Sequence, residues 1–313
     1  MANLEHATQH PPFNRVASDS DSNTDPSIPS TMALVIDVQD FARMDAVDAT
    51  NYARKLAEDL TTLREQGVPV TWITMRKDAQ LYEPKDVTLN ALPQVRNMEE
   101  LREMGFHGVD PEHENHDIFR DFLLNHGPRT DEVVSVKSLK SALVEPEDAA
   151  NKPEYQASLE AECGEPLSEY FGSGTKTLAG YMREQGIQNT ILMGAVSSHC
   201  VSETAVSAAV KGFNPQVLTD AVLSWQGDED KVNPRTSLLL WRGTAGDEAA
   251  FDAYHQEKIN TKIADIAADR ARGFNFGDAE AISNMGFASS ATLAQKVVSN
   301  SINSSLLHRP EAV

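Results

Sequence analysis

The chain has 313 residues, of which 40% are hydrophobic, so it can form one large globular domain or two small ones. Lys and Arg number 27 against 47 Asp and Glu, a formal net charge of −20 that repels phosphate backbones and argues against a nucleic-acid partner. The mean hydropathy is −0.40, and no apolar run approaches the roughly 18 residues of a membrane span, so we expect no membrane association.

The start of the chain and its cysteine content predict a cytoplasmic protein. The first residues, MANLEHATQHPPF, lack a basic start followed by an apolar stretch, so no secretory signal is recognised. Cys163 and Cys200 are the only cysteines, and two cannot build a disulfide framework. A reducing compartment follows, in which either cysteine can be a working thiol.

Composition divides the chain into three segments. Residues 1–30 are rich in Ser, Asp, Asn and Pro and cannot bury enough apolar surface to offset their ordering entropy, which predicts a disordered tail. Residues 31–260 carry strand and helix patterns in alternation and form the predicted domain. Strand patterns stop beyond it, and an apolar stripe near 259–267 predicts a helical extension over 261–313. Such a stripe needs a partner surface, either the chain's own domain or another subunit, and we expect a homo-oligomer, either a dimer or a tetramer.

The first predicted strand is MALVID (32–37), a continuous apolar run typical of a strand covered on both faces. Apolar residues then keep helical spacing from Ala49 to Leu63, and Gly67 ends that helix. Residues 144–171 are acidic and show little periodicity. The remaining predicted elements are strands at 69–74, 132–136, 189–195 and 215–221 and helices near 98–104, 115–124, 175–185 and 199–211.

Strands that alternate with helices predict a doubly wound α/β fold, with a mostly parallel sheet and helices on both faces in a Rossmann-like three-layer arrangement. Five strands are recognisable, and no sixth is found. In open parallel sheets, ligands bind beyond the carboxyl ends of the strands. Three polar residues fall there: Asp37 closes the first strand, Lys137 closes the third, and Cys200 follows the fourth at a helix N-terminus.

These three residue types suit nucleophilic catalysis. A thiol at a helix N-terminus beside an ammonium group is expected to have a lowered pKa and to favour thiolate. Asp37 is placed to take the thiol proton and return it to a leaving nitrogen, and Lys137 to keep the carboxylate ionised and stabilise the thiolate. The turn before Cys200, GAVSSHC, offers backbone N–H groups to an oxyanion.

Four segments resemble the isochorismatase-like cysteine hydrolases, in the same order over about residues 31–255. ALVIDVQDF (33–41) resembles the opening of that family, and KSLKSAL (137–143) its lysine segment. GAVSSHCVSETAVSAAVKGF (194–213) is similar to its nucleophile segment, and VLTDAV (217–222) to the segment after its fifth strand.

The resemblance implies an Asp–Lys–Cys triad of Asp37, Lys137 and Cys200. It also implies a cis peptide between Ala195 and Val196, with the N–H groups of Val196 and Cys200 forming the oxyanion hole. Further candidates for the substrate pocket are Gln39 and Phe41, which follow Asp37, and Trp225, which follows the Asp-Ala pair at 220–221.

The chain departs from the family pattern in three places. Lys140 is a rival to Lys137, although the spacing to Ser141-Ala142 favours Lys137. Residues 144–171 are inserted where the family runs almost directly into a helix, and we expect them to fold over or beside the pocket. The Asp-x-His metal motif of the nicotinamidase branch is missing from TMRKDAQLYEP (74–84), so we expect no metal ion, no other cofactor and a substrate other than nicotinamide.

The predicted function is hydrolysis of a C–N bond in a small amide, carbamoyl or ureido compound, through an acyl-enzyme on Cys200. One alternative is hydrolysis of isochorismate, a vinyl ether, which in similar proteins typically does not depend on the cysteine. Another is a binding or effector protein that uses the scaffold without turnover. Cys163, in the acidic insertion, is expected to be inert.

Overall fold

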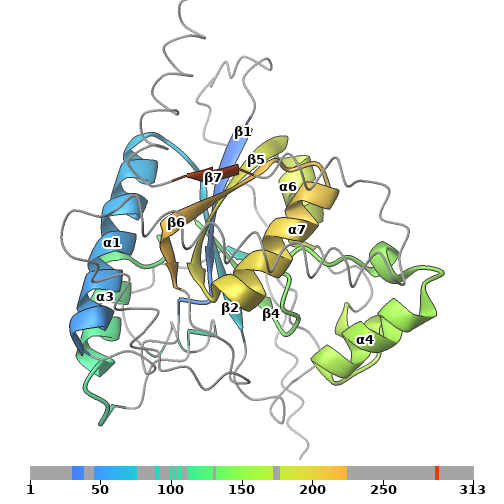
Figure 1. Ribbon diagram of the computed structural model, residues 1–313, viewed down its shortest axis with the longest axis horizontal. Helices are drawn as coiled ribbons and strands as arrows, with labels where there is room; N and C mark the ends of the chain where they lie inside the picture. The colour runs from blue at the N-terminus through green and yellow to red at the C-terminus, as the bar shows by residue number, and fades with distance from the viewer. Residues whose placement is uncertain are drawn as a thin grey trace, which may run out of the picture.

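A computed structural model describes residues 30–38, 46–75, 89–91, 99, 102, 105–106, 111–129, 132–171, 177–223 and 286–288. Within these residues, seven strands form one sheet in the order β3-β4-β2-β1-β5-β6-β7 (Figure 1). The strands are β1 (Ser30–Ile36), β2 (Val70–Met75), β3 (Leu89–Ala91), β4 (Val133–Lys137), β5 (Ile187–Ala195), β6 (Pro215–Leu223) and β7 (Gly286–Ala288).

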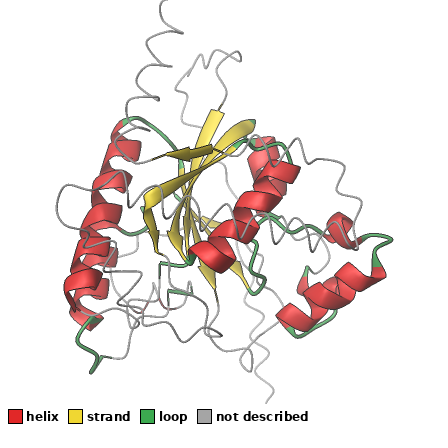
Figure 2. Ribbon diagram, viewed as in Figure 1, coloured by secondary structure: helices red, strands yellow, loops and turns green. Residues whose placement is uncertain are grey.

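Helices cover both faces of the sheet, so the predicted three-layer α/β fold is confirmed (Figures 1 and 2). α1 (Ala46–Glu65) and α3 (His116–His126) lie on one face, and α6 (Leu178–Glu184) and α7 (Ser202–Val210) on the other. Among the described residues, no helix combines the length and apolar character needed to cross a membrane. The shorter elements are η2 (Pro146–Ala149), α4 (Pro153–Cys163), α5 (Leu167–Tyr170) and η3 (Ser197–Val201).

The direction in which the chain is wound reverses at β1. β1 pairs in parallel with β2 on one side and β5 on the other, and β2 pairs in parallel with β4. On the far side β5, β6 and β7 are also parallel, whereas the short β3 runs antiparallel to β4. The carboxyl ends of β1 and β5 therefore flank the switch point where doubly wound folds bind ligands.

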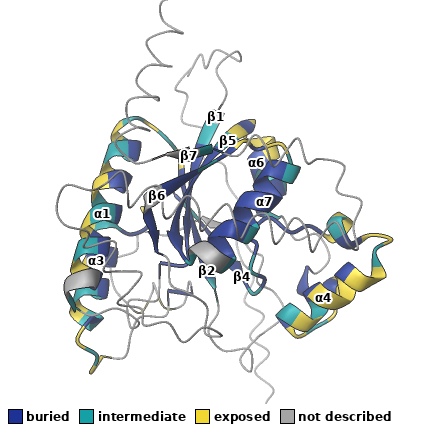
Figure 3. Ribbon diagram, viewed as in Figure 1, coloured by how far each residue is buried: buried dark blue, intermediate teal, exposed yellow. Residues whose placement is uncertain are grey.

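The central strand is buried on both faces, which explains its continuous apolar run (Figure 3). Ala33 and Val35 pack into the core layer beneath α1 and α3. Leu34 and Ile36 point the other way, into the layer beneath α6 and α7. Successive side chains of a strand alternate between faces, so one six-residue run supplies both layers.

Two edge strands were not predicted. β3 and β7 have three residues each, too few to show a periodicity. The expectation that no strand follows residue 260 is wrong, because Gly286–Ala288 pairs with β6. Residues 1–29 and the helix expected near 259–267 lie outside the described residues, as does most of the helix expected near 98–104.

The insertion at 144–171 folds into η2, α4 and α5 around an apolar cluster of its own. The buried residues of α4 are Tyr155, Leu159 and Cys163, one for each turn, so the apolar stripe is too narrow to stand out in the sequence. In Figure 1, α4 lies on the outer side of α7, away from α1 and α3. The cluster consists of Leu139, Val144, Ala149, Tyr155, Leu159, Cys163, Leu167, Tyr170 and Phe171.

The start of the insertion is tied to the helices by ion pairs. Glu145 accepts hydrogen bonds from Arg183 in α6 at 2.6 and 2.7 Å and from Lys211, just after α7, at 2.9 Å. Lys211 also donates to Asp148 at 2.7 Å. These bonds hold the first residues of the insertion in a fixed position against α6 and the end of α7.

We predict that Glu145→Gln lowers stability at pH 7 by about 1.5–3 kcal/mol, because it weakens hydrogen bonds between charged groups. Burial opposes ionisation, but the bonds from Arg183 and Lys211 lower the pKa of Glu145 to about 2. A lowered folded-state pKa stabilises the protein above the unfolded-state pKa of roughly 4.5, and this stability is lost as the pH falls toward 2. In urea denaturation, the difference between Glu145→Gln and wild type should shrink over that window. The exposed neighbour Glu147, changed to Gln, is the control and should have little effect.

We also predict that Gly194→Ala destabilises the fold by about 3 kcal/mol or more. Gly194 in β5 has φ +117°, and a Cβ there would collide with the backbone of Ile36 in β1. Gly212 is a matched control, because its φ of +81° is also positive but a Cβ there meets nothing within 4 Å. Gly212→Ala should lower the stability by only about 1 kcal/mol, which is the cost of the backbone strain alone. Equal losses in denaturation experiments would contradict the close approach of β1 and β5.

Candidate active site

Asp37 is the first residue after β1, at the carboxyl edge of the sheet. Its φ is 47°, in the left-handed region that few residues other than glycine adopt. Backbone strain of this kind persists where the surrounding structure holds it, and it is concentrated at functional sites. The side chain is largely buried, with 11% of it exposed.

Lys137 reaches Asp37 from β4 although β2 lies between their strands. Two strand spacings, roughly 9–10 Å, separate the two chains, so a long side chain is required. Nζ of Lys137 donates to Oδ2 of Asp37 at 2.8 Å, and the lysine side chain is only 2% exposed. Lys140 lies elsewhere: its side chain is 45% exposed, and its Nζ is 3.8 Å from Oε2 of Glu162 in α4. The lysine against Asp37 is therefore Lys137.

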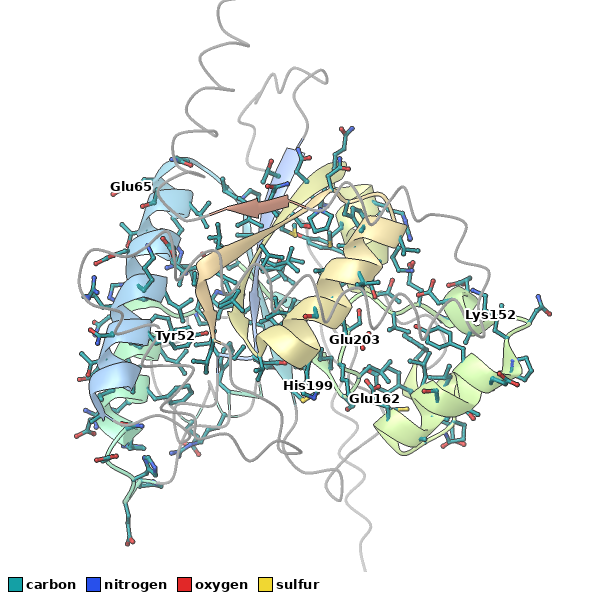
Figure 4. The ribbon with its side chains drawn as sticks, viewed as in Figure 1. Tyr52, Glu65, Lys152, Glu162, His199 and Glu203 are labelled. Carbon is teal, nitrogen blue, oxygen red and sulfur yellow. The ribbon has the colours of Figure 1, made fainter. Side chains whose placement is uncertain are left out.

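Cys200 lies in η3, the short π-helical turn between β5 and α7. The peptide bond between Ala195 and Val196 is cis, as the family resemblance implied. The carbonyl of Val196 accepts the N–H groups of His199 and Val201 at 3.1 and 3.2 Å, which closes the turn around Cys200. Figure 4 shows His199 at the N-terminal end of α7, where this turn leads into the helix.

The expectation of a lowered thiol pKa is wrong. Burial raises the pKa of Cys200 to about 12, and the negative charge of Asp37 raises it as well. Lys137 acts in the opposite direction but does not outweigh them. The sequence shows a cation near a helix N-terminus but not how completely the thiol is withdrawn from water, and desolvation is the larger effect. The resting thiol is protonated at neutral pH.

Lys137 and Tyr52, two other titratable groups around Asp37, each keep one protonation state near neutral pH. Burial lowers the pKa of Lys137, but Asp37 and Cys200 raise it more, so its net direction is upward and it stays an ammonium ion. Burial and the charge of Asp37 both raise the pKa of Tyr52, which stays a neutral phenol. Tyr52 lies on the side of α1 that faces the sheet (Figure 4). Tyr52 falls within the apolar stripe of that helix, so its sequence position does not mark it as a neighbour of Asp37.

One oxygen of Asp37 remains available. Oδ2 accepts a hydrogen bond from Lys137, whereas Oδ1 is buried and has no hydrogen-bond partner among the described residues. Asp37 also acts on the pKa of Cys200 through charge and side-chain hydrogen bonding. A carboxylate that acts on a protonated thiol in this way is a candidate acceptor for its proton.

The Ser-Ala pair after Lys137 ties the lysine strand to the helix that follows Cys200. The hydroxyl of Ser141 donates to Oγ of Ser207 at 2.8 Å, and the N–H of Ala142 donates to Oγ1 of Thr204 at 3.2 Å. Both acceptors belong to α7. The lysine segment (137–143) and the nucleophile segment (194–213) are thus hydrogen-bonded to each other.

The proposed pocket residues Gln39, Phe41 and Trp225 lie outside the described residues. Within the described part of the chain, no group of three or more His, Cys, Asp or Glu side chains is arranged to hold a metal ion. A cavity of about 410 Å³ lies between η2, α4 and α5 and includes none of Asp37, Lys137 and Cys200 in its lining.

The family model described as Isochorismatase domain matches residues 31–233, so the chain belongs to the isochorismatase family and is a hydrolase. No curated protein gives a significant match.

Solved structures are similar to this chain at low sequence identity. An isochorismatase family protein from Desulfovibrio vulgaris is 16% identical over 87% of this chain and 100% of its own, with a TM-score of 0.44. N-carbamoylsarcosine amidase from Thermoplasma acidophilum is 19% identical over 67% and 90%, with a TM-score of 0.35. A pyrazinamidase/nicotinamidase from Streptococcus mutans is 16% identical over 68% and 98%, with a TM-score of 0.38.

We predict that the rate of Cys200 alkylation by iodoacetamide rises about tenfold for each pH unit between pH 8 and 10, with no plateau near the ordinary thiol pKa of about 8.5. The reason is that the thiolate, the reacting species, is a minor form below a pKa of about 12. Mass spectrometry of the Cys200 peptide separates this reaction from that of Cys163. A plateau at or below pH 8.5 would show a preformed thiolate.

Lysine variants make that experiment specific. Lys137→Met removes the cation that lowers the thiol pKa, so alkylation should become slower at a given pH in the same range. Lys140→Met is the matched control and should leave the profile unchanged, because Lys140 pairs with Glu162. If Lys140→Met slowed the alkylation and Lys137→Met did not, Lys140 and not Lys137 would be the lysine that acts on Cys200.

Proposed function

We propose that this protein hydrolyses a C–N bond in a small amide, carbamoyl or ureido compound through a covalent acyl-enzyme on Cys200. The observation that supports this most directly is the buried ion pair of Asp37 and Lys137 at 2.8 Å, together with its electrostatic contact to the Cys200 thiol. Asp37 follows β1, Lys137 is the last residue of β4, and Cys200 follows β5, so all three lie at the edge where doubly wound folds bind ligands.

In the first step, Sγ of Cys200 attacks the carbonyl carbon of the substrate while the carboxylate of Asp37 takes the thiol proton. Transfer during attack is required because the resting thiol is protonated. Lys137 keeps a positive charge beside the carboxylate and the sulfur, where negative charge moves during this step. The backbone N–H groups of Val196 and Cys200 donate to the oxygen of the tetrahedral intermediate.

In the second step, the intermediate collapses, the C–N bond breaks, and Asp37 returns its proton to the leaving nitrogen. The thioester left on Cys200 is then attacked by water, with Asp37 again accepting a proton. The products are an amine or ammonia and the acid, and the enzyme regains its thiol. This sequence uses no metal ion and no organic cofactor.

The substrate class follows from this chemistry. A protonated leaving nitrogen and an acyl carbon open to a thiol define an amide, a carbamoyl compound or a ureide. The expected homo-oligomer, the cytoplasmic location and the division into 1–30, 31–260 and 261–313 stay predictions.

The test is a screen of small amides, carbamoyl compounds and ureides for ammonia release, followed by variants on the best substrate. Cys200→Ala should lower kcat/KM by about a thousandfold or more, because the covalent path is lost. Cys163→Ala is the matched control and should be nearly silent. Intact-protein mass spectrometry after rapid quenching should show the acyl adduct on wild type and none on Cys200→Ala.

Two outcomes would count against the proposal. If Cys200→Ala keeps more than a tenth of the activity, the covalent mechanism is wrong, and vinyl-ether hydrolysis, tested by pyruvate release from isochorismate, is favoured. If an adduct forms once and no ammonia accumulates beyond one equivalent, the protein is a binding or effector protein without turnover.

Asp37 and Lys137 should behave as one unit with the thiol. Asp37→Asn keeps the shape but removes the proton acceptor, and Lys137→Met removes the charge beside it. Each should lower kcat by about a hundredfold or more, and the double variant should be little worse than either one. Independent, multiplicative losses in kcat would contradict a shared proton-transfer step.

A further inference from the structure

The backbone that follows Lys137 is bonded by side chains of the insertion. The N–H of Ser138 donates to the hydroxyl of Tyr170, the last residue of α5, at 3.1 Å. The N–H of Lys140 donates to Oε1 of Glu162 in α4. Between them, Leu139 is 1% exposed and packs in the apolar cluster of the insertion. Three successive residues after Lys137 therefore depend on α4 and α5.

The next two residues of the chain are bonded to α7. Ser141 and Ala142 bond to Ser207 and Thr204, as described above. The segment thus lies between the helix that follows the nucleophile and the insertion. Figure 4 shows Glu162 on the side of α4 nearest the sheet.

The position of Lys137 depends on this backbone. Its side chain crosses the end of β2 to reach Asp37, and a buried ion pair is stabilising only when its geometry is close. Lys137 is the last residue of β4, so the sheet holds the backbone on one side of it only. On the other side, the peptide groups of Ser138 and Lys140 find their acceptors in the insertion.

Tyr170 also lies within the field of the ion pair. Burial raises the pKa of Tyr170 to about 12, although the N–H groups of Ser138 and Leu139 and the charge of Lys137 lower it. The hydroxyl is therefore neutral near pH 7 and is a fixed hydrogen-bond partner rather than a titrating group.

We propose that Tyr170 and Glu162 are positioning residues for Lys137, and that the insertion at 144–171 holds the lysine in register with Asp37 and Cys200. Both act through the backbone of residues 138–140 and not on the substrate. The inference rests on the proposed function for its consequence in catalysis, but its geometry is testable without a substrate.

The test measures alkylation of Cys200 by iodoacetamide in the full-length protein at pH 9. Lys137 lowers the pKa of the thiol, so a displaced lysine raises that pKa and reduces the thiolate fraction. Tyr170→Phe removes the acceptor for Ser138 and should slow alkylation about three- to tenfold, since one pKa unit is a factor of ten. An unchanged rate in a folded Tyr170→Phe protein would overturn the role of Tyr170.

Glu162 offers a conservative pair of variants. Glu162→Gln keeps an oxygen acceptor for the N–H of Lys140, whereas Glu162→Met keeps a similar length without one. Alkylation should be close to wild type in Glu162→Gln and slowed in Glu162→Met. If both are slowed equally, charge and not backbone positioning is responsible, and the proposal is wrong for Glu162. This pair also decides the question if Tyr170→Phe fails to fold.

A loosened insertion must be distinguished from a displaced lysine. Cys163→Ala removes a buried atom from the same apolar cluster without touching residues 138–140, and Cys200 should react at the wild-type rate. In a Lys137→Met background, Tyr170→Phe should slow alkylation no further, because the group it positions is gone. Further slowing in that background would show that Tyr170 acts independently of Lys137 and would overturn the proposal.

The readout separates this inference from the proposed function. Cys200 alkylation reports the ion pair whether or not an amide is hydrolysed. Full activity in Cys200→Ala would defeat the proposed function and leave the alkylation results standing. Unchanged alkylation in both Tyr170→Phe and Glu162→Met would defeat the positioning role while leaving the hydrolase intact.

Discussion

The arrangement of the site depends on one ion pair, buried between strands that are not neighbours. Asp37 and Lys137 are separated by β2, and both side chains are withdrawn from water. Removing either partner would leave an uncompensated buried charge, which is among the most destabilising changes a protein core can undergo. The left-handed backbone at Asp37 and the burial of a lysine at the last residue of β4 are both understandable as requirements of this pair.

The burial that strengthens the ion pair also determines the state of the nucleophile. In a drier site the attraction between Asp37 and Lys137 grows, but the charged form of Cys200 becomes less favourable. The result is a neutral thiol beside a carboxylate, so activation has to accompany attack on the substrate. A thiol protonated at rest is also less exposed to chance alkylation and oxidation, because the thiolate is the reactive form.

The sequence predicted the parts of the fold that carry long apolar patterns. Strands β1, β2, β4, β5 and β6 and helices α1, α3, α6 and α7 lie close to their expected positions, because each buries one or two faces over several residues. β3 and β7 are too short for that signal, and α4 buries only one residue for each turn. Their positions are decided by long-range pairing and packing, which no local pattern records.

The candidate site was predicted in outline for a topological reason: residues that follow parallel strands meet at one edge. The residue types alone left Lys137 and Lys140 open, and the structure separates them: Lys137 bonds to Asp37, whereas the side chain of Lys140 is 45% exposed and lies near Glu162. The sign of the thiol pKa shift was wrong, because charge and helix position can be read from a sequence but burial at a turn cannot. Tyr52 was hidden within an apolar stripe for the same reason.

The two sides of the site are brought together by different means. On the nucleophile side, β1 and β5 approach so closely that only glycine fits at residue 194, one residue before the cis peptide and six before Cys200. On the lysine side, no strand continues past Lys137, and side chains of α7 and of the insertion bond the chain instead. A close backbone contact tolerates almost no variation, whereas side-chain bonds to a separate apolar cluster permit it. The lysine segment is therefore the part of this site most open to adjustment, and the insertion is the element through which such adjustment would act.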